Sequence, residues 1–152
     1  MATAGFRSQN LRKGRSSVPQ QIYMITTVTH HRLPLFTDIQ TGRCVVKALQ
    51  EASSSARTLA FVVMPDHLHW LMQLNEGYSL SQSVQFVKST SSRLINRSLS
   101  KTGRVWSKGY YDQTLRREDD IIGYARYIVA NPLRAGLCRS VRYYPLWDAI
   151  WL

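Results

Sequence analysis

The chain has 152 residues, of which 44% are hydrophobic, and its 20 Lys and Arg residues against 9 Asp and Glu residues give a formal net charge of +11 at pH 7. This length suits one domain, the two isolated cysteines suit reduced thiols, and no apolar run is long enough for a membrane span or a signal peptide, so we expect a cytoplasmic protein without a membrane partner. The positive charge favours a polyanionic partner, nucleic acid rather than anionic lipid.

Residues 1–21 are expected to form a flexible basic arm outside the domain, which then spans residues 22–152. The arm carries Arg12, Lys13 and Arg15 among Ser, Gly, Gln and Asn residues, with few apolar side chains to anchor it. Such an arm can bind the phosphates of a nucleic acid. An uninvolved mobile terminus is an equally good interpretation.

The first half of the domain is expected to contain a strand, a helix and a second strand. The β-branched and aromatic sequence IYMITTVT at residues 22–29 predicts the first strand. Asp38 is a suitable N-cap for a helix over about residues 39–56. The continuous apolar run at residues 59–64 is too short for a helix and predicts a buried strand.

The next strand follows at once and carries two histidines. Pro-Asp at residues 65–66 ends the apolar run, and the alternation of side chains over residues 67–74 puts His67 and His69 on one face. Neighbouring side chains on one face of a strand stand roughly 7 Å apart, so two imidazoles can hold one divalent cation between them. Short motifs also occur by chance, and ordinary half-buried histidines are the alternative.

A second helix is predicted over residues 80–99, with Ser79 as its cap. Its surface carries Lys88, Arg93 and Arg97 beside a run of Ser and Thr residues. This face can follow a phosphate backbone as a DNA-binding surface, or it can simply be solvated.

The segment at residues 105–115 is aromatic and basic and is expected to contain a strand. This segment and the two arginines after it hold further candidates for DNA binding, namely Trp106, Lys108, Tyr110, Arg116 and Arg117. Aromatic rings interleaved with cations are typical of a surface that stacks bases and holds phosphates. Buried aromatics at a sheet edge are the alternative.

The predicted order of strand, helix, strand, strand, helix and strand is the split βαβ pattern of the ferredoxin-like fold, an α+β architecture. We expect a four-stranded antiparallel sheet with two helices on one face. The side of the histidine-bearing strand that faces these helices would carry Leu68, Trp70, Met72 and Leu74. The two histidines would then lie on the other, open face.

An additional C-terminal helix is predicted over residues 119–130, because Pro132 disfavours a helical conformation at the residue before it. Tyr124, Tyr127 and Asn131 fall on one face of this helix. They can be packing residues of an amphipathic helix. They can also bring a phenolate nucleophile and an amide ligand to a metal site.

Three motifs in this order resemble those of a known family. They are PDHLHW at residues 65–70, WSKGYY at residues 106–111 and YIVANPLRAGL at residues 127–137. With them the chain resembles the single-tyrosine transposases of the HUH superfamily, and within these the tyrosine transposases associated with bacterial repetitive extragenic palindromes (REP). The resemblance covers nearly the whole chain.

The resemblance implies an enzyme that nicks and joins single-stranded DNA at REP-type palindromic hairpins. It implies Tyr127 as the nucleophile that forms a 5′-phosphotyrosine intermediate, and ligation of Mg²⁺ or Mn²⁺ by His67, His69 and Asn131. Transposases of small insertion sequences commonly carry Gln at the position of Asn131, and Asn is one methylene shorter. The resemblance further implies a monomer that needs no ATP.

Two other functions fit the same residues. A non-catalytic protein with a sheet like that of RNA-recognition domains would bind single-stranded nucleic acid through its aromatics without cleaving it. A metal-dependent phosphodiesterase that uses water would nick DNA without a covalent adduct.

Overall fold

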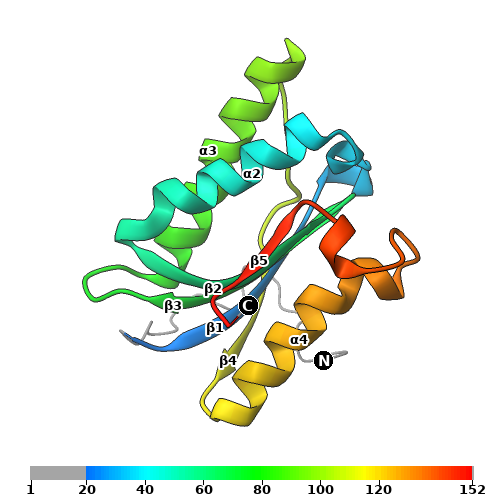
Figure 1. Ribbon diagram of the computed structural model, residues 1–152. Coiled ribbons are helices and arrows are strands. Elements are labelled where there is room, and N and C mark those ends of the chain that lie inside the picture. The colour runs from blue at the N-terminus through cyan, green and yellow to red at the C-terminus, as the bar shows by residue number, and fades with distance from the viewer. Residues whose placement is uncertain (1–19, 152) are drawn as a thin grey trace.

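The computed structural model describes residues 20–151, so Arg12, Lys13 and Arg15 of the predicted arm lie outside the described residues. Figure 1 shows one twisted sheet with helices on both sides. The strands are β1 (Ile22–Val28), β2 (Ala56–Met64), β3 (His67–Leu74), β4 (Tyr111–Leu115) and β5 (Trp147–Ala149). The helices are α2 (Ile39–Glu51), α3 (Leu80–Leu99) and α4 (Glu118–Arg134), with 3₁₀ turns at His30–Arg32, Leu35–Thr37, Ala52–Ser54 and Val141–Tyr143.

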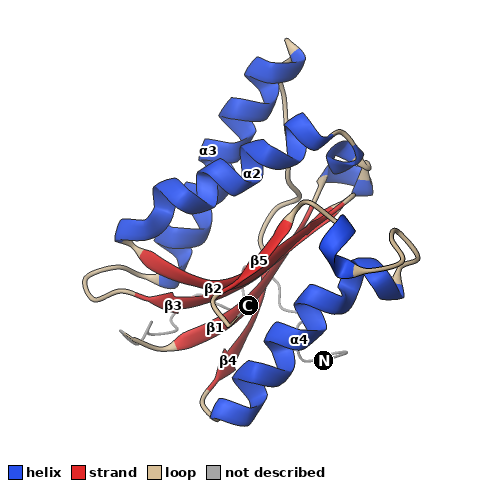
Figure 2. Cartoon of the chain, in the orientation of Figure 1, coloured by secondary structure: helices blue, strands red, loops and turns tan. Residues whose placement is uncertain are grey.

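The five strands pair antiparallel in the order β4-β1-β3-β2-β5. The predicted order of strands and helices as far as β4 is confirmed, whereas the predicted count of four strands is wrong because β5 pairs with the outer edge of β2. Figure 2 shows α2 and α3 on one side of the sheet and α4 on the other. None of the helices within residues 20–151 has the length and apolar character needed to span a membrane.

The face of the sheet toward α2 and α3 carries the larger apolar cluster. Alternate residues of β3 belong to it as predicted, since Leu68, Trp70, Met72 and Leu74 are all at most 1% exposed. In α2 and α3, apolar residues three to four positions apart turn one stripe of each helix toward the sheet. Removal of this apolar area from water is the main contribution that holds the two helices in place.

The opposite face is covered by α4 through a second apolar cluster. Ala125, Ile128 and Val129 of α4 pack in this cluster with Met24 of β1 and Leu71 of β3. Because side chains alternate along β3, the histidines two and four residues before Leu71 share this face. The face that the sequence predicts to be open is therefore the one against which α4 lies.

The first helix is shorter than predicted. Asp38 caps α2 as expected, but the helix ends at Glu51 rather than near residue 56. Three consecutive serines follow at residues 53–55, and hydroxyls of this kind compete with the helix for backbone hydrogen bonds. Ser55 Oγ, for example, donates to the backbone carbonyl of Ala52 at 3.1 Å. As a result β2 starts earlier than the apolar run suggests.

The other two helices follow the capping rules more closely. α3 has the predicted bounds, and Ser79 and Gln82 form a capping box at its start. α4 runs to Arg134 rather than to residue 130, although Pro132 lies inside it. Pro132 is in the last turn, so it removes a single helix hydrogen bond, and the helix stops before Gly136, whose φ is 74°.

The short strand β5 escapes sequence prediction because three residues are too few for a periodic pattern. The segment before it is fixed to β2 by Val63, whose amide donates to Leu146 O at 2.9 Å and whose carbonyl accepts from the Tyr144 hydroxyl at 2.6 Å. Burial is the main cause that raises the pKa of Tyr144 to about 12. The C-terminal segment thus closes one edge of the sheet.

Candidate active site

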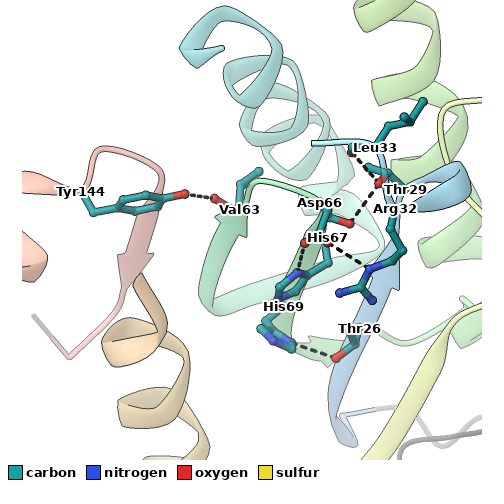
Figure 3. A network of polar contacts seen from close by, with 9 residues as sticks. All are labelled: Thr26, Thr29, Arg32, Leu33, Val63, Asp66, His67, His69 and Tyr144. Carbon is teal, nitrogen blue, oxygen red and sulfur yellow. Dashed lines mark hydrogen bonds and ion pairs between the residues drawn. The ribbon is translucent and has the colours of Figure 1, made fainter. Parts of the chain in front are cut away.

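Strand β3 presents two histidines on the face that α4 covers. His67 and His69 are separated by one residue in the strand, and their ring centroids lie 4.7 Å from each other with 79° between the ring planes. Figure 3 shows the two rings next to one another below Asp66. The predicted placement of both rings on one face is confirmed.

A carboxylate orients the first ring. Nδ1 of His67 lies 2.7 Å from Oδ1 of Asp66, and Oδ2 of Asp66 accepts from Nε of Arg32 at 3.0 Å (Figure 3). Burial acts to raise the pKa of Asp66, but the hydrogen bond and charge of His67 and the guanidinium of Arg32 together hold it below its usual value. An ionised carboxylate can only accept, so the shared proton belongs to Nδ1 of His67. Nε2 then keeps its lone pair for a ligand.

A hydroxyl holds the second ring. Nδ1 of His69 lies 2.9 Å from Oγ1 of Thr26, the residue opposite it on β1. Burial, followed by the charges of His67 and Arg134, lowers the pKa of His69 to about 3, and burial also lowers the pKa of His67. Both imidazoles are therefore neutral near pH 7. In each ring the hydrogen bond engages Nδ1, which leaves Nε2 as the nitrogen to bind a ligand.

Helix α4 brings a tyrosine to this pair. The ring centroids of Tyr127 and His69 are 6.0 Å apart, with 70° between the planes. The guanidinium carbon of Arg134 lies 4.1 Å from the Tyr127 ring centroid, and Nη2 of Arg134 donates to the Tyr127 carbonyl at 2.8 Å. Tyr127 is still 39% exposed, so its phenol remains accessible from solvent. Two neutral imidazoles, a phenol and a cation thus meet at one place.

The other helix residues named from the sequence have different surroundings. Asn131 is half-buried and lies one helical turn after Tyr127, on the same helix face by spacing. Tyr124 is engaged elsewhere, because its hydroxyl donates to Oε1 of Gln113 in β4 at 2.8 Å. The structure therefore brings Tyr127, and not Tyr124, beside the histidines.

Four residues of the site escaped the sequence analysis. Asp66, Arg32 and Thr26 fix the orientation of the imidazoles, and Arg134 packs over the tyrosine ring. The period of β1 gives a partial signal for Thr26, which shares the face of the strand that meets the histidines. The contact of Arg134 has no sequence signal, since it depends on the helix continuing past Pro132.

The residues predicted to bind DNA fall into two groups. Exposed on the surface are Arg93, Arg97, Lys108, Arg116 and Arg117. Engaged in packing or internal hydrogen bonds are Lys88, Trp106 and Tyr110. Trp106 is 4% exposed and packs against Phe36, so its ring is not free to stack on a base, and the alternative of a buried aromatic is correct.

Residues 17–131 match the family model described as IS200-like transposases. The chain belongs to this transposase family. The matched residues include both histidines and Tyr127 and end at Asn131. Apart from Arg134, the site described above thus lies within the part of the chain that matches the family model.

Three relatives support this result. A protein of Haemophilus influenzae described as a REP-associated tyrosine transposase is 26% identical over an alignment of 100 residues. The alignment covers 58% of this chain and 56% of the relative, so this chain spans about half of that protein. A REP-associated tyrosine transposase bound to a REP hairpin superimposes with a TM-score of 0.69 at 21% identity, over 88% of this chain and 79% of that one. A Deinococcus radiodurans protein described as a transposase gives a TM-score of 0.56 at 22% identity, over 76% and 94% of the two chains. At these identities the structural matches show a common fold.

The residues of the site suit a divalent metal ion as far as the imidazoles are concerned. A histidine that binds a metal through Nε2 usually donates its other ring N–H to a carboxylate, as His67 does here. Within residues 20–151 no group of three His, Cys, Asp or Glu side chains is arranged to hold a metal. A bound ion would therefore complete its coordination with oxygen from an amide, DNA or water.

Proposed function

We propose that this protein is a metal-dependent enzyme that nicks and joins single-stranded DNA at REP-type palindromic hairpins through a 5′-phosphotyrosine intermediate. The observation that carries the proposal is the position of the Tyr127 ring, 6.0 Å from the ring of His69 in a pair of neutral, oriented imidazoles. The hairpin as substrate is suggested by the solved relative, which is bound to one.

His67, His69 and Asn131 would hold Mg²⁺ or Mn²⁺. When bound, the ion supplies a positive charge that neutralises and orients the scissile phosphate. Asp66 keeps the proton of His67 on Nδ1, and Thr26 holds the ring of His69 in place, so both side chains meet a ligand in a fixed orientation.

Tyr127 would be the nucleophile. Its phenolic oxygen attacks the phosphorus, the bond to the 3′ oxygen breaks, and the phenolic proton is lost to solvent while the leaving 3′ oxygen takes up a proton. The phosphotyrosine ester retains the energy of the broken bond, so the 3′-hydroxyl of another strand can reverse the step without ATP. The cation of Arg134 lies over the ring and limits its rotation.

The DNA would be bound mainly through its phosphates. The proposed phosphate contacts include five exposed cations on and after α3, namely Arg93, Arg97, Lys108, Arg116 and Arg117. The N-terminal arm with Arg12, Lys13 and Arg15 would add contacts next to the hairpin. Lys88, Trp106 and Tyr110 would act indirectly, because they shape the segment that carries Lys108.

We further infer that residues 22–152 form one ferredoxin-like domain that acts as a monomer in the cytoplasm. The order β4-β1-β3-β2 supports the ferredoxin-like assignment, with β5 and α4 as additions to it. The monomer is proposed from the resemblance to REP-associated tyrosine transposases, and Tyr127 lies beside His69 within a single copy of the chain.

The decisive experiment is incubation with a palindromic single-stranded oligonucleotide and Mn²⁺, followed by denaturing electrophoresis. Wild-type protein and Tyr124→Phe should give a denaturant-stable protein–DNA adduct, whereas Tyr127→Phe should give neither adduct nor cleavage while it keeps its fold and DNA affinity. Cleavage by Tyr127→Phe without an adduct would indicate a phosphodiesterase that uses water. Binding of the DNA by the wild-type protein without any cleavage would indicate a non-catalytic binding protein.

A further inference from the structure

A groove lies between α3 and the segment over residues 103–109, on the side of the sheet away from α4. It has a volume of about 470 Å³ and is lined by Gln85, Lys88, Ser89, Ser92, Gly103, Arg104, Val105, Trp106, Ser107, Lys108 and Gly109. Three of these residues are basic and none is acidic. The remaining side chains include hydroxyls and an amide, which are donors for an anion. The groove therefore has the composition of an anion-binding site.

The groove is held open by bonds between α3 and the backbone of the segment. Nζ of Lys88 donates to the carbonyls of Ser107 and Gly109 at 2.8 and 2.7 Å, and Nδ2 of Asn96 donates to the carbonyl of Gly103 at 3.0 Å. Both glycines have positive φ, 105° at Gly103 and 75° at Gly109, which other residues adopt with strain. The segment is thus fixed at both ends, and the groove does not need a ligand to form.

The same segment connects the groove to the end of the sheet that carries the active site. The amide of Ser107 donates to the carbonyl of Val28 at 2.9 Å, and Val28 is the residue of β1 that pairs with His67. The amide of His30 donates to Val105 O at 2.9 Å in the same region. A DNA strand that leaves the histidine pair at this end can therefore continue around the sheet into the groove.

We propose that this groove binds the sugar–phosphate backbone of the single-stranded DNA that flanks the hairpin, with Arg104 and Lys108 paired to phosphates. Both side chains are exposed at the rim, whereas the ammonium of Lys88 is occupied by backbone carbonyls. A groove between a helix and a fixed segment encloses one strand, while a duplex would lie across its rim. The assignment rests on the proposed function, because it takes single-stranded DNA as the ligand.

The test is the salt dependence of DNA binding by the double variant Arg104→Ala, Lys108→Ala. Binding of a fluorescent hairpin oligonucleotide with single-stranded flanks is measured by anisotropy in EDTA, so that no cleavage occurs. Each lost contact to a single strand lowers the slope of log K against log salt by about 0.7, so the two substitutions should lower it by about 1.4. A fourfold rise in salt should then weaken binding about sevenfold less in the variant than in the wild type.

The matched control is Arg43→Ala, Lys47→Ala, which removes the same charge from exposed positions of α2 outside the groove. This control, and a hairpin without flanks, should show no change of slope. An equal change in the control would mean that only net charge matters, and an equal change with the flank-free hairpin would mean that the cations contact the stem. Either result, or an unchanged slope with a normal melting curve, would overturn the assignment. Failure of the wild-type protein to form an adduct would instead count against the nuclease proposal and leave the slope measurement interpretable.

Discussion

The carboxylate of Asp66 gives a direct test of how the histidine pair is prepared for a metal. Its Oδ1 lies 2.7 Å from Nδ1 of His67, and both the hydrogen bond and the charge of Asp66 act to raise the pKa of that imidazole. Asp66→Ala removes both the hydrogen bond and the charge, so the imidazole of His67 becomes harder to protonate. Protons then compete no more strongly with the metal for this ring than they do in the wild type. Any loss of metal affinity must then come from lost orientation and lost basicity of the ring.

Loss of such a partner typically weakens metal binding about 10-fold to 100-fold, which corresponds to about 1.4 to 2.7 kcal/mol. We expect Asp66→Ala to weaken Mn²⁺ binding within this range, as measured by titration calorimetry without DNA. Asp66→Asn should lose less, because its amide oxygen can still accept from Nδ1 of His67. Cleavage by the Asp66→Ala variant should recover when the Mn²⁺ concentration is raised.

The control for this experiment is Glu76→Ala, which removes a negative charge from an exposed turn. An equal loss of Mn²⁺ affinity in this control would mean that net charge is responsible. Wild-type affinity in Asp66→Ala, with an unchanged melting curve, would refute the role of the carboxylate. Loss of affinity that also lowers the melting temperature strongly would point to misfolding, and Asp66→Asn then decides the matter.

Three further predictions follow from other contacts. Arg134→Met should slow adduct formation at saturating DNA about tenfold, because a cation over a ring contributes about 0.5 to 2 kcal/mol. Arg134→Lys should slow adduct formation less. Equal slowing by Arg126→Met, on the exposed side of α4, would contradict this prediction. The pKa of Tyr144 is raised to about 12, so this phenol stays protonated to a higher pH in the folded state than in the unfolded state. The free energy of unfolding measured with urea should therefore fall as the pH rises above 10. Tyr144→Phe should flatten this dependence, and an unchanged dependence would assign it to other groups. Removal of residues 1–15 should lower the salt slope of DNA binding by roughly 0.9 for each duplex phosphate that the arm contacts, and an unchanged slope would make the arm uninvolved.

The parts of the fold that the sequence predicts are those set by local chemistry. Alternation along a strand is enough to put His67 and His69 on one face and Trp70 on the other, whatever the rest of the chain does. The start of α3 follows from the capping box of Ser79, which is a local signal as well.

The sequence-based predictions are wrong where a contact with a distant part of the chain determines the local structure. Pro132 is an unfavourable helix residue in isolation, but it is buried in the last turn of α4, and the helix runs on to Arg134. Trp106 has the neighbours of a base-stacking residue in the sequence, yet a hydrogen bond to Ser91 and contact with Phe36 place it in the core. β5 depends entirely on the edge of β2, which no local pattern reveals.

The connection between β4 and α4 is two residues long, Arg116 and Arg117. β4 is paired along β1, and α4 folds back over the same sheet through its own apolar cluster. In this arrangement Tyr127 and the histidine beside it belong to the same copy of the chain. On the proposal of a monomer, we expect that a mixture of two inactive proteins, one without His69 and one without Tyr127, does not regain cleavage. An exchange between two DNA ends would then need two intact copies, or one copy that reacts twice in succession.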